Sequence, residues 1–391
     1  MSAKQQKGNL DQLLAAALAL PIVAVPVTAQ ADDARLPPGA VIGSRVLSYR
    51  ETGDRMKVLE PVLWLKTPIG ERWEFSASAT IDIVSGASAI TVTNVSGRPA
   101  QVYTGASITD RRKANDAGLK YKFGELNEHA LAATYATSFE KDYDSKAYGL
   151  NATFDFNERN TTLALGYGGS DDIVRSVTDR TLVRDRRSRE LLMGFTQLLD
   201  RSTLVQSNLT ITRQSGYLND PYRLTISLFP GGGGTLAKDT RPDTRRIIAW
   251  LTRAKRANGA NGFLSGEYRY ARDDWGVRSH TLALSWQKPF GELWAIEPGL
   301  RYYTQRAADF YRPEILAAPV PRHTSSDQRL ASFGALEPSL KLILKLNAET
   351  TVDLSYAYYR QQGNWRLGGG GTASFAPLSA NLIGAGLVYR F

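Results

Sequence analysis

The last thirteen residues, 379–391, constrain the fold more than any other stretch because their side chains alternate strictly between two kinds. One kind is apolar or aromatic: Ile383, Ala385, Leu387, Tyr389 and Phe391. The other kind is small or polar: Gly384, Gly386 and Arg390. Since successive side chains of a strand point to opposite sides, this period of two predicts a β-strand with one apolar face. An edge strand of a soluble sheet would fit the same pattern.

Six further segments repeat this alternation clearly, and nine repeat it more faintly. The clear segments are 73–83, 118–123, 131–139, 148–156, 336–346 and 351–358. The fainter segments are 42–50, 56–67, 161–170, 188–199, 203–214, 245–256, 263–273, 279–290 and 294–305. With the C-terminal segment they predict about sixteen strands, and an even number is typical of single-chain bacterial barrels.

The connections between these segments alternate in length along the chain. Short turns rich in Gly, Asn or Asp are expected at 68–71, 124–127, 157–160, 200–202, 258–262, 291–292 and 347–349. Long loops are expected at 86–110, 171–187, 215–243, 306–330 and 362–378. A soluble β-sandwich has no reason to sort its connections in this way. The sequence therefore predicts an all-β fold: a single transmembrane antiparallel β-barrel with short periplasmic turns and long extracellular loops.

The N-terminus predicts export. Residues 1–31 have a basic start, an apolar middle and a small-residue site at Ala29-Gln30-Ala31, which together are typical of a signal peptide cleaved after Ala31. We then expect a short periplasmic segment at 32–40 and the barrel at 41–391, in the outer membrane of a Gram-negative bacterium. A mean hydropathy of −0.29 is too polar for a helical membrane protein but ordinary for a barrel. The chain has no cysteine, so it has no disulfide framework.

Short motifs in a specific order carry a family resemblance over nearly the whole mature chain. They are Asp-Arg-Met-Lys-Val at 54–58, Ser-Gly-Ala-Ser at 85–88, Asp-Arg-Arg at 110–112, Phe-Asp-Phe-Asn-Glu-Arg-Asn-Thr-Thr-Leu at 154–163, and Gly-Tyr-Leu-Asn-Asp-Pro-Tyr at 216–222. In these the chain resembles a proteobacterial outer-membrane β-barrel family catalogued only as a domain of unknown function. Ala89 stands where the family pattern has proline, so the opening of that loop is expected to differ.

The resemblance implies a fold, a location and partners rather than an activity. The C-terminal strand resembles that of bacterial outer-membrane barrels, in which the barrel-insertion machinery reads the final aromatic residues, here Tyr389 and Phe391. Family members are encoded near flavin-transferase and thioredoxin-like proteins, which implies a periplasmic partner protein in an export or redox-linked setting.

Catalytic, metal-binding and cofactor-binding patterns are thin, and we expect no enzyme activity, no metal and no cofactor. Ser279 and His280 are adjacent, and outer-membrane phospholipases carry a Ser–His pair on an outward face. No third orienting residue accompanies this pair, so a lipid hydrolase is only the second alternative. The acidic pairs Asp171-Asp172 and Asp273-Asp274 lack the spaced ligands of a calcium loop and are expected to be solvated loop residues.

Charge distribution suggests two surfaces. Arginines gather near the external strand ends, where they can contact phosphate groups of lipopolysaccharide or line a pore that favours anions: Arg111, Arg112, Arg186, Arg187, Arg245 and Arg246. The alternation turns other charged residues toward the lumen: Glu74, Asp82, Lys120, Lys122, Asp155, Glu337, Lys341, Lys345 and Asp353. Nucleic acid is not an expected partner, because no nucleic-acid-binding fold accompanies the scattered arginines.

A barrel of about sixteen strands leaves an interior wider than side chains alone can fill. The leading functional interpretation is a porin-like channel for small polar or anionic solutes, which the long loops 86–110 and 215–243 can constrict. The first alternative is an export or structural barrel that depends on a periplasmic, redox-linked partner. Outer-membrane lipid and lipopolysaccharide are expected around the barrel.

Overall fold

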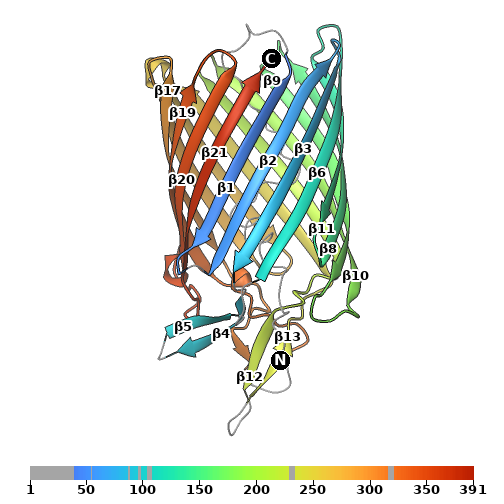
Figure 1. Cartoon of the computed structure of the whole chain (residues 1–391), viewed down its shortest axis with the longest axis vertical. Coiled ribbons are helices and arrows are strands. Elements are labelled where there is room, and N and C mark those ends of the chain that lie inside the picture. Colours follow the sequence, from blue (N-terminus) through green and yellow to red (C-terminus); the bar gives the residue numbers. More distant parts are fainter. Residues whose placement is uncertain are drawn as a thin grey trace.

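Sixteen antiparallel strands close into one barrel in chain order, and β1 pairs with β21 to complete the ring (Figure 1). A computed structural model describes residues 39–53, 55–86, 89–95, 98–103, 108–228, 234–315 and 321–391. The predicted signal peptide, and the predicted periplasmic segment up to residue 38, lie outside the described residues.

The barrel wall consists of β1 (Val41–Glu51), β2 (Met56–Ile69), β3 (Trp73–Gly86), β6 (Ile108–Phe123), β7 (His129–Phe139), β8 (Tyr143–Phe156), β9 (Thr161–Arg175), β10 (Val183–Asp200), β11 (Thr203–Gly216), β14 (Thr244–Ala257), β15 (Phe263–Asp273), β16 (Arg278–Phe290), β17 (Trp294–Gln305), β19 (Phe333–Lys345), β20 (Thr350–Gln362) and β21 (Leu378–Arg390). The fold predicted from the period of two is therefore confirmed, including the number of wall strands.

The outer face of the wall is apolar. Leucines in strands all around the ring are more than half exposed, among them Leu63, Leu131, Leu150, Leu165, Leu284, Leu340 and Leu354. A continuous apolar belt of this kind is unfavourable in water and is matched by the hydrocarbon of a bilayer. The protein is an outer-membrane β-barrel. Among the described residues, no helix is both long and apolar enough to cross a membrane.

The two ends of the barrel differ. At one end the connections are short, and the chain turns through residues with positive φ such as Asn127, Asn157 and Glu158. The C-terminus lies at this end, which is the periplasmic end by the rule for such barrels (Figure 1). The connections at the other, extracellular end contain β4 (Ala89–Val95), β5 (Arg98–Tyr103), β12 (Leu224–Leu228), β13 (Gly234–Lys238) and β18 (Glu314–Ile315). Figure 1 shows β4, β5, β12 and β13 beyond the end of the wall.

Several strands extend further outward than predicted. The predicted loop 171–187 shrinks to 176–182, because β9 continues to Arg175 and β10 begins at Val183. Likewise β6 begins at Ile108, ten residues before the segment expected at 118–123. Strand pairing continues above the apolar belt. Both faces of the strands meet water there, so polar side chains occur on both and the sequence resembles that of a loop. Asp172 and Asp273, expected in solvated loops, are strand residues with partners on the inner face.

Candidate functional site

The inner face of the wall is polar, and several of its charged side chains lie in pairs of opposite sign. Buried Asp82 accepts a hydrogen bond from Arg112 on the neighbouring strand. Asp353 lies 3.4 Å from Arg45 and 3.8 Å from Lys341. The Arg45 side chain is 54% exposed although it points into the barrel, so open space adjoins these pairs. The interior is therefore able to hold water.

The alternation that exposes Trp73 and Leu119 on the outer face turns the predicted lumen residues inward. Some have partners there: Glu74 lies 3.2 Å from Lys66, Glu337 lies 3.6 Å from Arg301, and Asp155 accepts a hydrogen bond from Thr162. The full inner-face set is Glu74, Asp82, Lys120, Lys122, Asp155, Glu337, Lys341, Lys345 and Asp353. Their part in conduction stays a prediction.

The six rim arginines occur as three consecutive pairs, and the wall divides each pair between its two faces. The exposed outward members are Arg111, Arg187 and Arg246. Each inward member lies beside an aspartate: Arg112 beside Asp82, Arg186 beside Asp172, and Arg245 beside Asp273. Consecutive strand residues cannot face the same side. The outward three keep the predicted access to lipopolysaccharide, and the inward three fit the alternative expectation that some of these arginines line the pore. Both roles stay predictions.

Three extracellular connections pack into one folded unit, which we call the cap: the described residues of 217–243, 306–332 and 363–377. Its apolar core also includes Trp275 from the β15–β16 turn and Phe333 from β19. The rings of Phe333 and Phe375 stack at 4.9 Å, and Tyr303 of the inner wall packs against this core. The core thus joins the loops to the inner face of the wall at the extracellular mouth.

Buried ion pairs lock two of the cap loops together. Asp327, which is 1% exposed, accepts a hydrogen bond from Arg241 Nη2 at 2.9 Å and from Arg329 Nε at 2.8 Å. Arg329 also donates to Asp220 at 2.9 Å, and Arg241 donates to Asp239 at 2.7 Å. Backbone bonds between Thr240 and Thr324, at 2.9 and 2.8 Å, join the same two loops.

These surroundings fix the charge of Asp327. Burial alone would raise the pKa of its carboxyl group, but Arg329, Arg223 and Arg241 together lower that pKa well below its usual range. Burial also disfavours the charged form of Arg241, yet Asp239 and Asp327 outweigh it and raise the pKa of this guanidinium. Both side chains therefore stay ionised. The cap keeps these charged groups away from water, so removing one of them would leave its buried partners unpaired.

A further contact extends the cap across the mouth toward β7, β8 and β9. The Tyr222 hydroxyl donates to Asp142 in the β7–β8 turn and accepts from the backbone N–H of Val177 at 3.0 Å. Asp142 also brings a carboxylate oxygen within 4.8 Å of those of Asp110 and Glu140. Carboxylate oxygens suit hard cations such as Ca²⁺, but an acidic cluster does not by itself establish a metal site, and we assign none.

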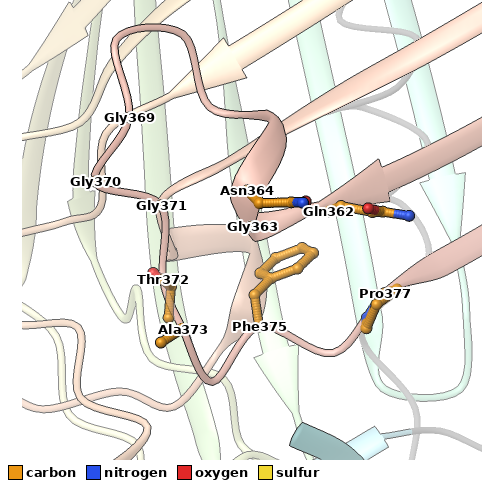
Figure 2. Close-up of a pocket in the computed structure, with 10 residues that line it drawn as sticks. All are labelled: Gln362, Gly363, Asn364, Gly369, Gly370, Gly371, Thr372, Ala373, Phe375 and Pro377. Atoms are coloured by element: carbon orange, nitrogen blue, oxygen red, sulfur yellow. The ribbon is translucent and has the colours of Figure 1, made fainter. Parts of the chain in front are cut away.

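Close backbone approach shapes the third cap loop. A Cβ atom on Gly371 would lie 1.8 Å from the carbonyl oxygen of Gly363, so this crossing requires glycine. Gly369, Gly370 and Gly371 form part of the wall of a 430 Å³ cavity next to η3 (Gly363–Trp365). Figure 2 shows Phe375 between this glycine segment and the end of β20, with Asn364 and Gln362 beside it. The described lining residues carry no charged side chain, and we assign this cavity no ligand.

Ser279 and His280 do not form a pair. His280 lies on the outer face, where its Nδ1 is 2.8 Å from the Tyr268 hydroxyl and its ring lies 5.1 Å from that of Tyr270. Ser279 lies on the inner face, opposite Gln305 of β17. Because adjacent strand residues point to opposite sides, these two side chains cannot act on one substrate.

The predicted insertion signal lies at the periplasmic end of β21. The rings of Tyr389 and Phe391 meet edge to face at 4.8 Å, and both are exposed. The Phe391 N–H donates to the carbonyl of Ala40, so the last residue still belongs to the closing strand pair. Recognition by the insertion machinery stays a prediction.

Sequence reasoning missed the cap network, because it treated the long loops as featureless. One available signal was the motif at 216–222, which contains Asp220 and Tyr222. Another was the concentration of arginine and aspartate in loops that the membrane does not require to be charged. Neither signal could specify the partners, since Asp220 and Arg329 are 109 residues apart.

The fold is similar to that of solved outer-membrane proteins. A bacterial polysaccharide outer membrane secretin matches with 8% identity over 91% of this chain and 99% of that chain, at a TM-score of 0.48. The siderophore receptor PirA from Pseudomonas aeruginosa matches with 11% identity over 90% of this chain and 62% of that chain, at 0.45. The CymD monoaromatic hydrocarbon channel matches with 10% identity over 91% of this chain and 89% of that chain, at a TM-score of 0.43. Similarities this distant carry no argument about function.

No curated protein matches the chain. The family model for a protein of unknown function, DUF3570, matches residues 10–189 and 178–382. These two matches together span most of the sequence, and the resemblance drawn from the short motifs is confirmed. With its closed sixteen-strand barrel and folded extracellular cap, the chain belongs to the DUF3570 family.

Proposed function

We propose that this protein is a gated outer-membrane channel for small polar solutes, closed at its extracellular mouth by the cap. The observation that carries the proposal is the contrast between a polar, solvent-adjoining inner wall and a dry, ion-paired cap. A barrel without a transport role would need neither a polar inner wall next to open space nor a buried network of ion pairs at its mouth.

The inner wall supports passage of polar solutes. Its cations and carboxylates alternate and pair, as with Asp353 between Arg45 and Lys341. Paired charges attract ions of both signs weakly and present hydrogen-bonding groups along the wall. We therefore expect conduction with only a slight preference for anions.

The cap supports gating rather than permanent closure. Its two ion-paired loops are held by a few concentrated contacts around Asp327, and packed cores of this kind have discrete alternative arrangements rather than continuous ones. Loss of those contacts would release both loops together. Opening would then uncover the mouth without altering the wall.

Single-channel conductance of the refolded protein in planar bilayers tests the proposal. We expect the wild type to be closed most of the time, with brief open steps. Asp327→Asn removes the charge that three arginines share, so we expect it to raise the open probability at unchanged step size. Asp353→Asn is the matched control, because it removes a paired carboxylate from the wall and leaves the cap intact.

Two results would contradict this function. The first is an Asp327→Asn variant that conducts no more than the wild type although proteolysis shows its cap loops released. The second is a wild type that conducts steadily with the cap intact.

The first of these results would favour the second candidate, a barrel for partner-dependent export. A cap closed from outside suits that role too, because a periplasmic component would then supply the force that opens it. Copurification of a periplasmic protein with the wild type, together with silence in bilayers, would be the expected pattern.

A further inference from the structure

An uninterrupted row of arginines crosses three neighbouring strands on the outer face. Arg189 of β10 lies directly opposite Arg213 of β11, and Arg213 lies directly opposite Arg246 of β14. All three lie on the same face of their strands as the outward apolar residues. Only one of them, Arg246, belongs to the rim set expected from the sequence.

Apolar rows lie immediately below these arginines. One step toward the membrane centre, the outward residues on the same three strands are Leu191, Ile211 and Ile248. One step further they are Met193, Leu209 and Trp250, which are all exposed to the surroundings. The arginine row therefore marks the height at which hydrocarbon gives way to polar headgroups on the extracellular side.

Like charges opposite each other across a strand pair are destabilising. Adjacent strands are about 4.8 Å apart, so the three arginine side chains leave the wall from neighbouring positions. The guanidinium of Arg189 extends toward β8, where it lies over the Tyr148 ring, 5.4 Å from the ring centroid. Arg189 is partly compensated, because it donates to Asp171 at 2.9 Å. Among the described residues, no carboxylate pairs with the guanidinium of Arg213 or Arg246; Asp274 accepts from the Arg246 backbone N–H instead.

The basic surface continues beyond this row. On the next two strands, Arg272 of β15 and Arg278 of β16 also lie opposite each other and are exposed. The wall thus presents outward arginines on five adjacent strands at its extracellular end. A cluster of this kind, bordered below by an apolar surface, is complementary to an amphiphile with several negative charges close together.

We propose that Arg189, Arg213 and Arg246 form a binding site for the phosphate groups of lipopolysaccharide, the phosphorylated glycolipid of the outer leaflet. Each guanidinium offers paired N–H donors that match phosphate oxygens. The acyl chains of the same molecule would lie along the rows of Leu191 and Met193. This site lies on the outer face and does not depend on the proposed channel function.

The test measures binding of lipid A to the full mature protein in detergent, by native mass spectrometry and by the shift of its melting temperature. The probes are diphosphorylated lipid A, the same glycolipid after removal of its phosphates, and inorganic phosphate. We expect only diphosphorylated lipid A to bind tightly. Arg213→Gln should weaken this binding about tenfold, or by about 1.4 kcal/mol, because it removes one charged donor from the phosphate site.

Arg256→Gln is the matched control. It removes the same charge from the same face of β14, but exposed Arg256 lies at the periplasmic end of the strand, opposite Thr203 and Leu264. We expect binding to this variant to stay within about twofold of the wild type. Resistance to unfolding in cold detergent, with its shift in gel mobility, checks that every variant forms the barrel.

Three results would overturn the proposal. One is equal binding by Arg213→Gln and the wild type, with the triple Arg189→Gln, Arg213→Gln, Arg246→Gln variant also unchanged. Another is equal binding of the dephosphorylated glycolipid, which would assign the affinity to acyl chains. The last is displacement of lipid A by inorganic phosphate at matched concentration, which would mean that the site recognises free anions.

Discussion

In the barrel wall, Asp353 lies between Arg45 and Lys341, and both cations keep contact with open space. In the cap, Asp327 lies among three arginines and is almost wholly buried. The two sites use the same chemical groups in different dielectric surroundings. Exposed ion pairs contribute about 0–1 kcal/mol, whereas removing one member of a buried pair costs about 3–5 kcal/mol. The wall should therefore tolerate charge changes that the cap does not.

The largest expected difference comes from neutralising one aspartate in each region. Asp327→Asn should lower the free energy of opening the cap by about 3–5 kcal/mol, because it leaves buried arginines without their shared partner. Asp353→Asn should lower the stability of the wall by about 1 kcal/mol or less. Hydrogen exchange of the Thr240 and Thr324 amides, which bond across the two cap loops, measures the first change. Equal protection of these amides in both variants would remove the distinction.

The apolar core of the cap should give the next largest effect. Phe375→Ala removes a buried ring that stacks on Phe333, and truncations of this kind cost about 3–5 kcal/mol. Leu367→Ala in the same loop should change stability by about 0.5 kcal/mol or less, because Leu367 is exposed. Protease sensitivity of the loop 363–377 compares the two. If Leu367→Ala were cleaved as fast as Phe375→Ala, the loop would not be held by this core.

A smaller difference is expected between two glycines of the same loop. Gly371→Ala places a Cβ against the backbone of Gly363, and crowding of this kind costs about 1–3 kcal/mol. Gly369→Ala has free space around its Cβ, so it should cost only about 1 kcal/mol through its positive φ. Thermal unfolding of the cap, followed by tryptophan fluorescence, should rank the two variants in this order. The reverse order would mean that the backbone at Gly363 and Gly371 moves apart to accommodate the added Cβ.

The smallest expected effect is that of mild acid. The pKa of Asp327 is lowered in the folded cap, so its contribution to stability is present above the unfolded pKa of about 3.9 and is lost as the pH falls toward the folded pKa. Between pH 7 and pH 5 the cap should therefore stay closed as far as Asp327 is concerned. Bilayer recordings across this range measure the open probability. A marked opening at pH 5 would show that another group controls the cap.

Much of the wall was predictable from the sequence, because its pattern follows from local geometry. Each strand residue points to one of two sides, and it is apolar where that side faces lipid and polar where it faces the lumen. Residues such as Leu340 and Lys341 therefore reveal their faces without knowledge of their neighbours. The exact reach of the strands was less predictable, since above the membrane Asp171 and Arg187 suit a strand and a loop equally well.

The sequence by itself determined that this chain forms a barrel with one apolar and one polar surface. Only the tertiary structure decided which arginines lie opposite one another on the outer face, because that depends on the register between strands, as in the row from Arg189 to Arg246. It also decided the cap, whose contacts join Arg241 to Asp327 and Tyr222 to Asp142 across 86 and 80 residues. Loops have no repeating period to record such partners, so their pairing emerges only when the closed ring brings distant strand ends together.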